Sequence, residues 1–305
     1  LNGNGEMTGT HWVDDSGFLH GPVMITNTNS VGIVRDTTAK WMVDNDYFPP
    51  AFKDGKEVPG LGFFYPVVGE TFDGTLNNIN GFKVTPEDVL AALDSAAGGP
   101  VQEGCGGGGT GCHGFKGGTG TASRIVETEL GEYTLGVLVQ ANHGTREELN
   151  IRGVPVGREI VGYEQDIRKM SLKEGDGSII VVIATDAPFL PWQLSKISRR
   201  AALGIGRLGG GYQTGSGDLF LAFSTANENA YTYRSAEITI FSDELIDPFF
   251  KATAEAVEEA IVNALVNAED MYGRNRNFVP ALPKDQLREI LRKYRGYLDM
   301  AYPQG

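Results

Sequence analysis

The chain has 305 residues, of which 41% are hydrophobic and 21% charged, so it can bury a substantial core in one large domain or two small ones. Its net charge of -13 disfavours a nucleic-acid partner, and no apolar run approaches the roughly 18 residues of a membrane span. The sequence therefore predicts work on a small molecule or a peptide, with neither nucleic acid nor membrane as a partner.

The amino end opens on Leu1, without an initiator methionine, a charged leader or an apolar signal segment. We expect the chain to lack an upstream segment of a longer product. Its compartment stays open between bacterial cytoplasm and periplasm. No long repeat and no low-complexity linker divides the chain. A single catalytic domain over residues 1–305 is expected.

The first half of the chain predicts one strand, one capped helix and one hairpin. Residues 22–26 have the length and composition of a short strand. Residues 85–88 read Thr-Pro-Glu-Asp, the order of an N-cap, a first-turn proline and first-turn acids, and predict the start of a helix. Residues 124–128 and 133–140 flank a Leu-Gly pair and predict an antiparallel hairpin.

The second half alternates strands with helices. Strands are predicted at residues 178–185, 219–225 and 238–241, and a helix at 191–203. A long helix with one apolar stripe is predicted to begin at Asp247-Pro248 and to close near Gly273. The pattern indicates an α/β protein whose sheets are at least partly antiparallel.

A glycine tract at residues 104–120 invites comparison with phosphate-binding loops. Its only lysine, Lys116, follows Phe115 rather than glycine, so the order required of a Walker loop is missing. The tract indicates instead a close approach of backbone to backbone or ligand. Cys105 and Cys112 lie inside it, and the sequence leaves open whether they form a disulfide.

The four histidines show no metal-binding spacing. They are His11, His20, His113 and His143, and no two are spaced as in the helical zinc motifs. Two cysteines are also too few for a structural zinc site. We therefore predict no metal and no other cofactor.

The pair Gly177-Ser178 precedes an apolar strand and suggests a hydroxyl nucleophile. Cleavage between them would give Ser178 a free α-amine, whose pKa is about 8 when unperturbed. One residue would then hold both a nucleophile and a general base. The polar stretch at residues 170–176 suits an exposed loop that can be cut. An ordinary loop-to-strand junction is the alternative reading.

Several segments together resemble the L-aminopeptidase/D-amidase-esterases and their β-peptidyl aminopeptidase members, which are self-cleaving serine peptidases. The resemblance spans nearly the whole chain. It is carried by Asn2–Gly9, Thr26–Gly32, Val67–Gly74, Gly114–Gly118, Val139–Asn142, Gly177-Ser178 and Ala184–Pro188.

The resemblance implies a four-layer α/β/β/α sandwich of the N-terminal-nucleophile type. It implies self-cleavage between Gly177 and Ser178, giving a larger subunit of residues 1–177 and a smaller one of 178–305. A homotetramer of these processed pairs is expected by the same resemblance. No cofactor is implied.

The resemblance also assigns roles to individual residues. Ser178 would be the nucleophile, and Asn142 would donate to the developing oxyanion. Ser216 would bond near the nucleophile, and Asp218 would orient it and favour its ammonium form. Other members carry glutamate at this last position, so the carboxylate here is one methylene shorter.

Two further residues would bind substrate. Glu70 would attract the substrate's free amino group, and Phe72 would line the acyl-side pocket. The implied substrates are small peptides, amides or esters with a free amine. Two alternatives stand beside this reading: an acyl transferase of the ornithine acetyltransferase type, against which Ser178 argues because that type uses threonine, and a non-catalytic binding protein on the same scaffold.

Overall fold

A twisted five-stranded sheet forms the centre of the protein. The computed structural model describes residues 1–48, 51–58, 62–104, 108–163, 177–232 and 235–301. The strand order is β1-β11-β10-β9-β8, in which β10 and β11 are parallel and the other pairs antiparallel. These strands are β1 (Asn2–Gly3), β8 (Gly118–Thr128), β9 (Gly131–Asn142), β10 (Gly177–Thr185) and β11 (Ser216–Ser224).

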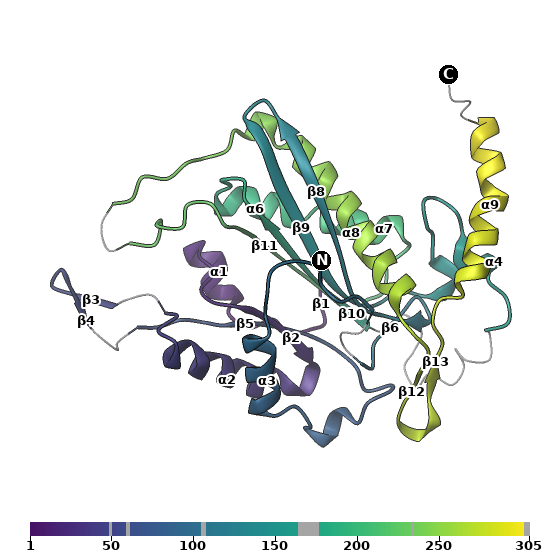
Figure 1. Ribbon diagram of the computed structural model, residues 1–305, viewed down its shortest axis with the longest axis horizontal. Helices are drawn as coiled ribbons and strands as arrows, with labels where there is room; N and C mark the ends of the chain where they lie inside the picture. Colours follow the sequence, from purple (N-terminus) through teal and green to yellow (C-terminus); the bar gives the residue numbers. More distant parts are fainter. Residues whose placement is uncertain (49–50, 59–61, 105–107, 164–176, 233–234, 302–305) are drawn as a thin grey trace.

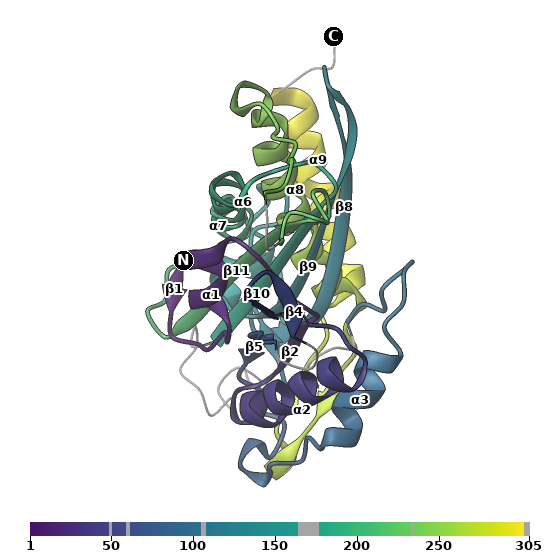
Figure 2. The same ribbon diagram turned by 90° about the vertical axis from the view of Figure 1, so that its left-hand side faces the viewer.

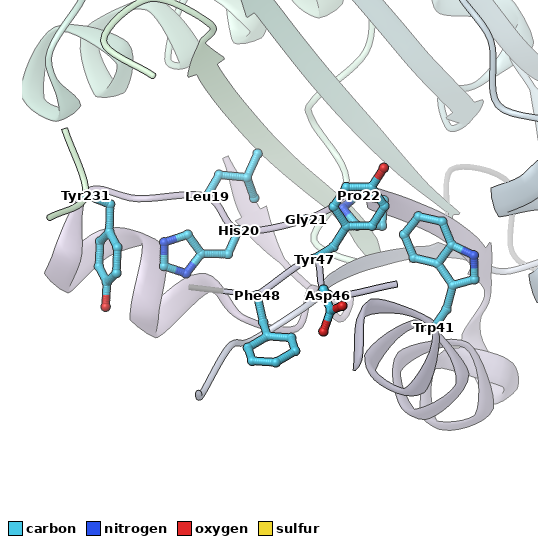
Figure 3. Close-up of a pocket in the computed structure, with 9 residues that line it drawn as sticks. All are labelled: Leu19, His20, Gly21, Pro22, Trp41, Asp46, Tyr47, Phe48 and Tyr231. Atoms are coloured by element: carbon cyan, nitrogen blue, oxygen red, sulfur yellow. The ribbon is translucent and has the colours of Figure 1, made fainter. Parts of the chain in front are cut away.

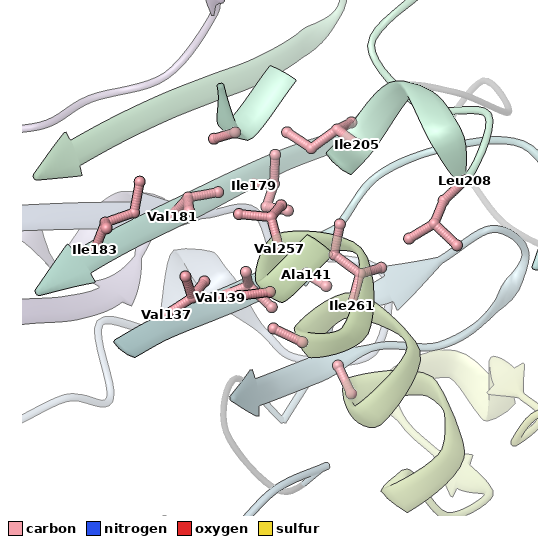
Figure 4. Packing of buried hydrophobic residues seen from close by; sticks show 14 of the residues in the cluster. Val137, Val139, Ala141, Ile179, Val181, Ile183, Ile205, Leu208, Val257 and Ile261 are labelled. Carbon is pink, nitrogen blue, oxygen red and sulfur yellow. The ribbon is translucent and has the colours of Figure 1, made fainter. Parts of the chain in front are cut away.

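One face of this sheet is covered by helices. The long helix α8 crosses β8 and β9, and α7 lies beside it (Figures 1 and 2). Alternate strand residues point toward α8 and bury aliphatic side chains against it, as Figure 4 shows for Val139 and Val181 facing Val257 and Ile261. The helices on this face are α6 (Pro191–Ser198), α7 (Ala201–Arg207) and α8 (Asp247–Asn267).

The contact between α8 and the sheet depends on small residues. A Cβ placed on Gly120 of β8 would lie 1.9 Å from the carbonyl oxygen of Ala260 in α8. Alanines 252, 256, 260 and 264 recur along one buried stripe of the helix. Helix and strand backbones therefore approach more closely than larger side chains would allow.

The opposite face of the sheet packs on a second, two-stranded parallel sheet. Gly69 of β5 leaves room for Ile180 of β10, whose side-chain atoms would lie 3.2 Å from a Cβ on that glycine. Helices α2 and α3 pack against each other, and α2 covers the outer side of this sheet (Figure 2). The second unit contains β2 (Val23–Asn27), β5 (Val67–Thr71), α2 (Val31–Asp44) and α3 (Pro86–Asp94).

The layers thus run helix, sheet, sheet, helix, and the predicted four-layer α/β/β/α sandwich is confirmed. The remaining elements border it: α1 (Thr10–Ser16), β3 (Ala51–Lys53), β4 (Lys56–Val58), β6 (Gly111–Cys112), β7 (Phe115–Lys116), α4 (Val156–Glu159), β12 (Met271–Tyr272), β13 (Phe278–Val279) and α9 (Lys284–Ala301). Among the helices that the structure describes, none has the length and apolar character needed to cross a bilayer.

Most predicted elements are present, and some are longer than predicted. The hairpin of β8 and β9 turns at Gly131, whose φ of +126° is one that residues with a Cβ rarely adopt. Helix α3 begins with the predicted cap: Thr85 accepts from the Asp88 backbone N–H, and the Asp88 carboxylate accepts from the Thr85 N–H. The predicted strands at 22–26 and 178–185 correspond to β2 and β10.

Three predicted elements differ in the structure: two helices in their extent, and one strand that does not form. The helix predicted at residues 191–203 is two helices, α6 and α7, and the break lets Gly204 of α7 sit against α8, where a Cβ would lie 2.6 Å from the Ala254 carbonyl oxygen. Residues 238–241 form no strand, because their bonds go singly to loops, such as Phe241 N–H to the Pro188 carbonyl at 3.0 Å.

The long helix α8 ends at Asn267, not near Gly273. Gly273 lies instead in the hairpin of β12 and β13, where its N–H donates to the Asn277 carbonyl at 2.8 Å. A Cβ on Gly273 would lie 2.3 Å from the Leu76 carbonyl oxygen. The glycine therefore serves a close backbone approach and not a helix cap.

Candidate active site

Ser178 lies at the amino end of β10, in the middle of the five-stranded sheet. It is directly opposite Asn142 of β9 on one side and Gly217 of β11 on the other. Its side chain is buried, and its Oγ has no hydrogen-bond partner within the described part of the chain. An unpartnered buried hydroxyl costs free energy, and a ligand that bonds to the Ser178 hydroxyl would recover that cost.

Strand alternation turns Ser178 toward the second sheet. Its neighbour Ile179 faces α8 with the aliphatic core, and Ile180 faces Gly69 of β5. Ser178 therefore points away from the helices. On its side lies a cavity of about 590 Å³, lined by Asn4, Gly5, Glu6, Thr28, Glu70, Phe72, Gly177, Ser178 and Gly215.

Glu70 is a buried carboxylate in the wall of this cavity. It stands on β5, with 3% of its surface exposed. Its Oε1 accepts from the Glu6 backbone N–H at 3.0 Å, and its Oε2 accepts from the Thr28 hydroxyl. No ion pair to Glu70 exists among the described residues. A buried carboxylate without a cation is a favourable partner for a ligand's ammonium group.

Asn142 is fixed at both ends of its side-chain amide. Its Oδ1 accepts from the Gly111 N–H at 2.8 Å, and its Nδ2 donates to the Phe72 carbonyl at 2.8 Å. Because the amide nitrogen carries two protons, one remains after the bond to Phe72. The Asn142 amide is thus pre-oriented beside Ser178, and it also joins the strand end to Phe72.

Ser216 and Asp218 lie on β11 at the positions that flank Ser178 in the register. Ser216 pairs with Gly177, and Asp218 pairs with Ile179, so both project from the helix-facing side of the sheet. The Ser216 hydroxyl donates to Asp218 Oδ1 at 2.6 Å. Asp218 Oδ2 has no partner within the described part of the chain.

Burial raises the pKa of the Asp218 carboxyl above its ordinary value. The bond from the Ser216 hydroxyl lowers that pKa by less than burial raises it. A cation placed beside this carboxyl would restore its charged form. The α-amine that cleavage would create on Ser178 belongs to the adjacent strand.

The structure thus brings Ser178, Asn142, Glu70 and Phe72 around one cavity, and it places Ser216 and Asp218 on the strand beside the Ser178 backbone. Sequence reasoning missed Thr28, which holds Glu70 in place. Its signal was present, since Thr28 lies in one of the segments that carry the family resemblance.

A second cavity, of about 620 Å³, lies elsewhere and contains none of the predicted site residues. It is lined by aromatic side chains, with His20 beside Tyr231 at one end and Trp41 beside Tyr47 at the other (Figure 3). Burial lowers the pKa of His20. Among the described residues, this cavity is lined by neither a serine nor a cysteine.

One cluster has the donor types of a metal site, although the sequence spacing indicated none. Cys112, His113 and His143 are buried, and a sulfur or ring-nitrogen atom from each lies within 4.8 Å of the others. Cys112 is a free thiol, whereas Cys105 lies outside the described residues. The loop predicted at residues 170–176 also lies outside them.

Comparison with solved structures defines the class of protein. The fold matches that of the L-aminopeptidase D-Ala-esterase/amidase from Ochrobactrum anthropi, with a TM-score of 0.85 and 48% identity over 97% of this chain and 79% of that one. That enzyme is described as a prototype of the serine aminopeptidases and a variant of the Ntn hydrolase fold. A β-aminopeptidase from a Burkholderia species matches with a TM-score of 0.80 and 41% identity, covering 96% and 79% of the two chains. This protein has the Ntn hydrolase fold.

Sequence comparison then gives the family. The family model described as peptidase family S58 matches residues 1–279. The beta-peptidyl aminopeptidase BapA of Sphingosinicella microcystinivorans is 48% identical over 96% of this chain and 74% of its own length. The chain belongs to peptidase family S58 and is a serine-type peptidase.

Proposed function

We propose that this protein is a self-cleaving aminopeptidase and amidase whose nucleophile is Ser178. The observation that carries the proposal is the unpartnered Ser178 hydroxyl on the wall of a cavity that also holds the buried Glu70 carboxylate. The relatives' names, serine aminopeptidase and beta-peptidyl aminopeptidase, support it. A single catalytic domain carries the whole site.

Self-cleavage follows from the position of Ser178 after Gly177. The Ser178 Oγ attacks the Gly177 carbonyl carbon, and the peptide C–N bond breaks as the nitrogen takes up the hydroxyl proton. Water then hydrolyses the resulting ester, leaving a carboxylate on residue 177 and a free α-amine on residue 178. A Cβ on Gly177 would lie 2.0 Å from the Asn142 carbonyl oxygen, so only glycine fits here without moving a strand.

In turnover, the new α-amine takes the proton from the Ser178 hydroxyl as the oxygen attacks the substrate carbonyl. The free proton of the Asn142 amide donates to the oxyanion. The leaving amine receives the proton from the α-ammonium, and water hydrolyses the ester to regenerate the enzyme. Asp218, with Ser216 bonded to it, stabilises the ammonium form of the Ser178 amine.

Glu70 gives the reaction its preference for a free amino terminus. Its carboxylate attracts an ammonium group in a cavity that is partly closed to water, whereas an acylated amine carries no charge to attract. Phe72 lines the same cavity on the acyl side. The substrates proposed are small peptides, amides or esters with a free amine, including β-peptides. The active form proposed is a homotetramer of processed subunit pairs.

The decisive experiment is the intact mass and amino-terminal sequence of the purified protein. We expect two polypeptides, residues 1–177 and 178–305, and a single uncut chain for Ser178→Ala with no measurable hydrolysis. Two pieces in a clean Ser178→Ala preparation would contradict self-cleavage. An uncut, inactive wild-type protein would favour the binding-protein alternative, and transfer of an acetyl group to ornithine would favour the transferase.

The role of Glu70 is tested with a matched substrate pair, one peptide with a free amine and the same peptide N-acetylated. Wild-type protein should hydrolyse only the free form. Glu70→Gln, which keeps an oxygen for the Glu6 N–H, should lower kcat/KM for the free form at least about 100-fold. Equal rates on both peptides would remove Glu70 from this role.

A further inference from the structure

Three potential metal ligands converge behind the sheet, on its helix-facing side. Cys112 ends β6, His113 is the next residue, and His143 directly follows β9. Cys112 Sγ lies 3.9 Å from His143 Nδ1, and the two imidazole rings have centroids 5.2 Å apart. All three side chains are at most 3% exposed.

The histidines hold ring nitrogens that have no partner in the described part of the chain. His113 Nδ1 donates to the Thr145 carbonyl at 3.0 Å, so its Nε2 carries a lone pair. Both this Nε2 and that of His143 are buried and unpartnered there. Two buried ring nitrogens without a hydrogen-bond partner are unfavourable unless something binds them.

Glycines make the space for these rings. A Cβ on Gly144 would lie 2.4 Å from the His113 ring, and one on Gly210 would lie 2.8 Å from the His143 ring. His113 itself has a φ of +49°, a left-handed conformation that is costly for a residue with a side chain. The chain thus accepts backbone strain to hold the His113 imidazole inside this cluster.

We propose that Cys112, His113 and His143 bind one Zn²⁺ ion. One thiolate and two imidazoles are the donors that zinc prefers, whereas magnesium and calcium prefer oxygen. Ligand atoms around tetrahedral zinc stand roughly 3.3–3.6 Å apart, so these three have to contract by about 1 Å on binding, and a water would take the fourth position. The thiol proton leaves to solvent as the sulfur–zinc bond forms.

The location indicates a structural ion. The His113 N–H donates to the His143 carbonyl at 2.7 Å, and Gly111 donates to Asn142 Oδ1. Zinc would therefore fasten the turn between β6 and β7 to the end of β9, immediately behind the Asn142 amide. None of the three ligands lines the Ser178 cavity. The zinc site does not depend on the proposed function.

The test is metal content and spectroscopy of the purified protein. After Zn²⁺ exposure and removal of excess, we expect one zinc per chain by elemental mass spectrometry and a Tm about 5 °C higher than after chelation. Co²⁺ should give a thiolate-to-cobalt charge-transfer band. Cys112→Ser should abolish the band, and His20→Ala, which changes a histidine outside the cluster, should keep it.

Absence of both bound zinc and the cobalt band in wild-type protein overturns the proposal, as does equal zinc in wild type and Cys112→Ser. Retention of Cu⁺ with exclusion of Zn²⁺ overturns the assignment of the ion. If Cys112→Ser does not fold, His143→Gln replaces it, and the wild-type cobalt spectrum decides on its own.

Discussion

At the start of β10, one face of the sheet has its polar side chains around a cavity, and the other face has them packed against the helices. The face toward β5 places Ser178, Asn142 and Glu70 around a cavity of about 590 Å³. The face toward the helices seals Asp218 and His143 among aliphatic side chains. A polar group on the first face can be satisfied by substrate, and one on the second only by another part of the protein or by a buried ion.

Asn142 and His143 show the difference within two consecutive residues. Asn142 is opposite Ser178 and bonds the Phe72 carbonyl on the cavity side. His143 lies near Gly210 and Ile205 of the helical layer and meets Cys112 there. The strand end therefore serves two sites, and strand alternation keeps them apart. Substitutions on the cavity side are expected to change catalysis, and substitutions on the helix-facing side to change stability.

Of the substitutions that compare the two faces, those at Asn142 have the largest expected effect. Asn142→Ala removes the oxyanion donor, so kcat should fall about 10²–10³-fold in processed enzyme. Asn142→Asp is the matched variant, because it keeps an acceptor for the Gly111 N–H and loses the donor. Similar losses in the two variants, measured by steady-state kinetics, support the donor role. Full activity in Asn142→Asp would mean that the amide only anchors the loop.

Two adjacent valines in β10 compare the faces by stability alone. Val181 is buried against the helices, whereas Val182 is only partly buried on the other side. Val181→Ala should lower the free energy of unfolding by about 2–3 kcal/mol, and Val182→Ala by about 1 kcal/mol or less. Denaturant titration of both, in uncut Ser178→Ala protein, measures the difference. Equal losses would show that the second face is packed as tightly as the first.

Local patterns predicted much of the fold. The Thr85 cap, the β8–β9 hairpin and the apolar strand β10 are each encoded within about a dozen residues, which is the range over which capping, turn and alternation signals act. The break after α6 was not predictable in this way. It depends on where Gly204 meets α8, a contact between segments about 50 residues apart.

The two candidate sites also differ in how far their residues could be predicted from local sequence. Ser178, Asn142, Glu70 and Phe72 were predicted from a family resemblance, and their meeting at one cavity required the register of β9 with β10. The Cys112 cluster was missed because about 30 residues separate its histidines, and no helical spacing links them. Only the pairing of the strand ends brings these ligands together.

The contribution of Asp218 to the unfolding free energy should depend on pH in the way expected of a buried carboxyl rather than a solvated one. Because burial raises its pKa in the folded state, its stabilising contribution is complete below the ordinary value and is lost as pH rises through the folded one. In uncut Ser178→Ala protein, Asp218→Asn should therefore become more stable relative to its parent as pH rises from 4 to 8. A pH-independent difference in unfolding free energy would contradict this.

Replacing Asp243 should change the pH dependence of the unfolding free energy in the opposite direction, and by the smallest amount. It is half exposed and accepts from Lys196 and Gln193, each at 2.7 Å, and these bonds lower its pKa. Its stabilising contribution is therefore present above the ordinary carboxyl pKa and is lost as pH falls through the lowered one. Asp243→Asn should be slightly less stable than its parent at pH 7 and equal to it in acid, and salt should shrink the gap. Measured in the same background, the two aspartates should give unfolding curves whose differences change with pH in opposite directions, because one carboxyl loses its water on folding and the other gains a cation.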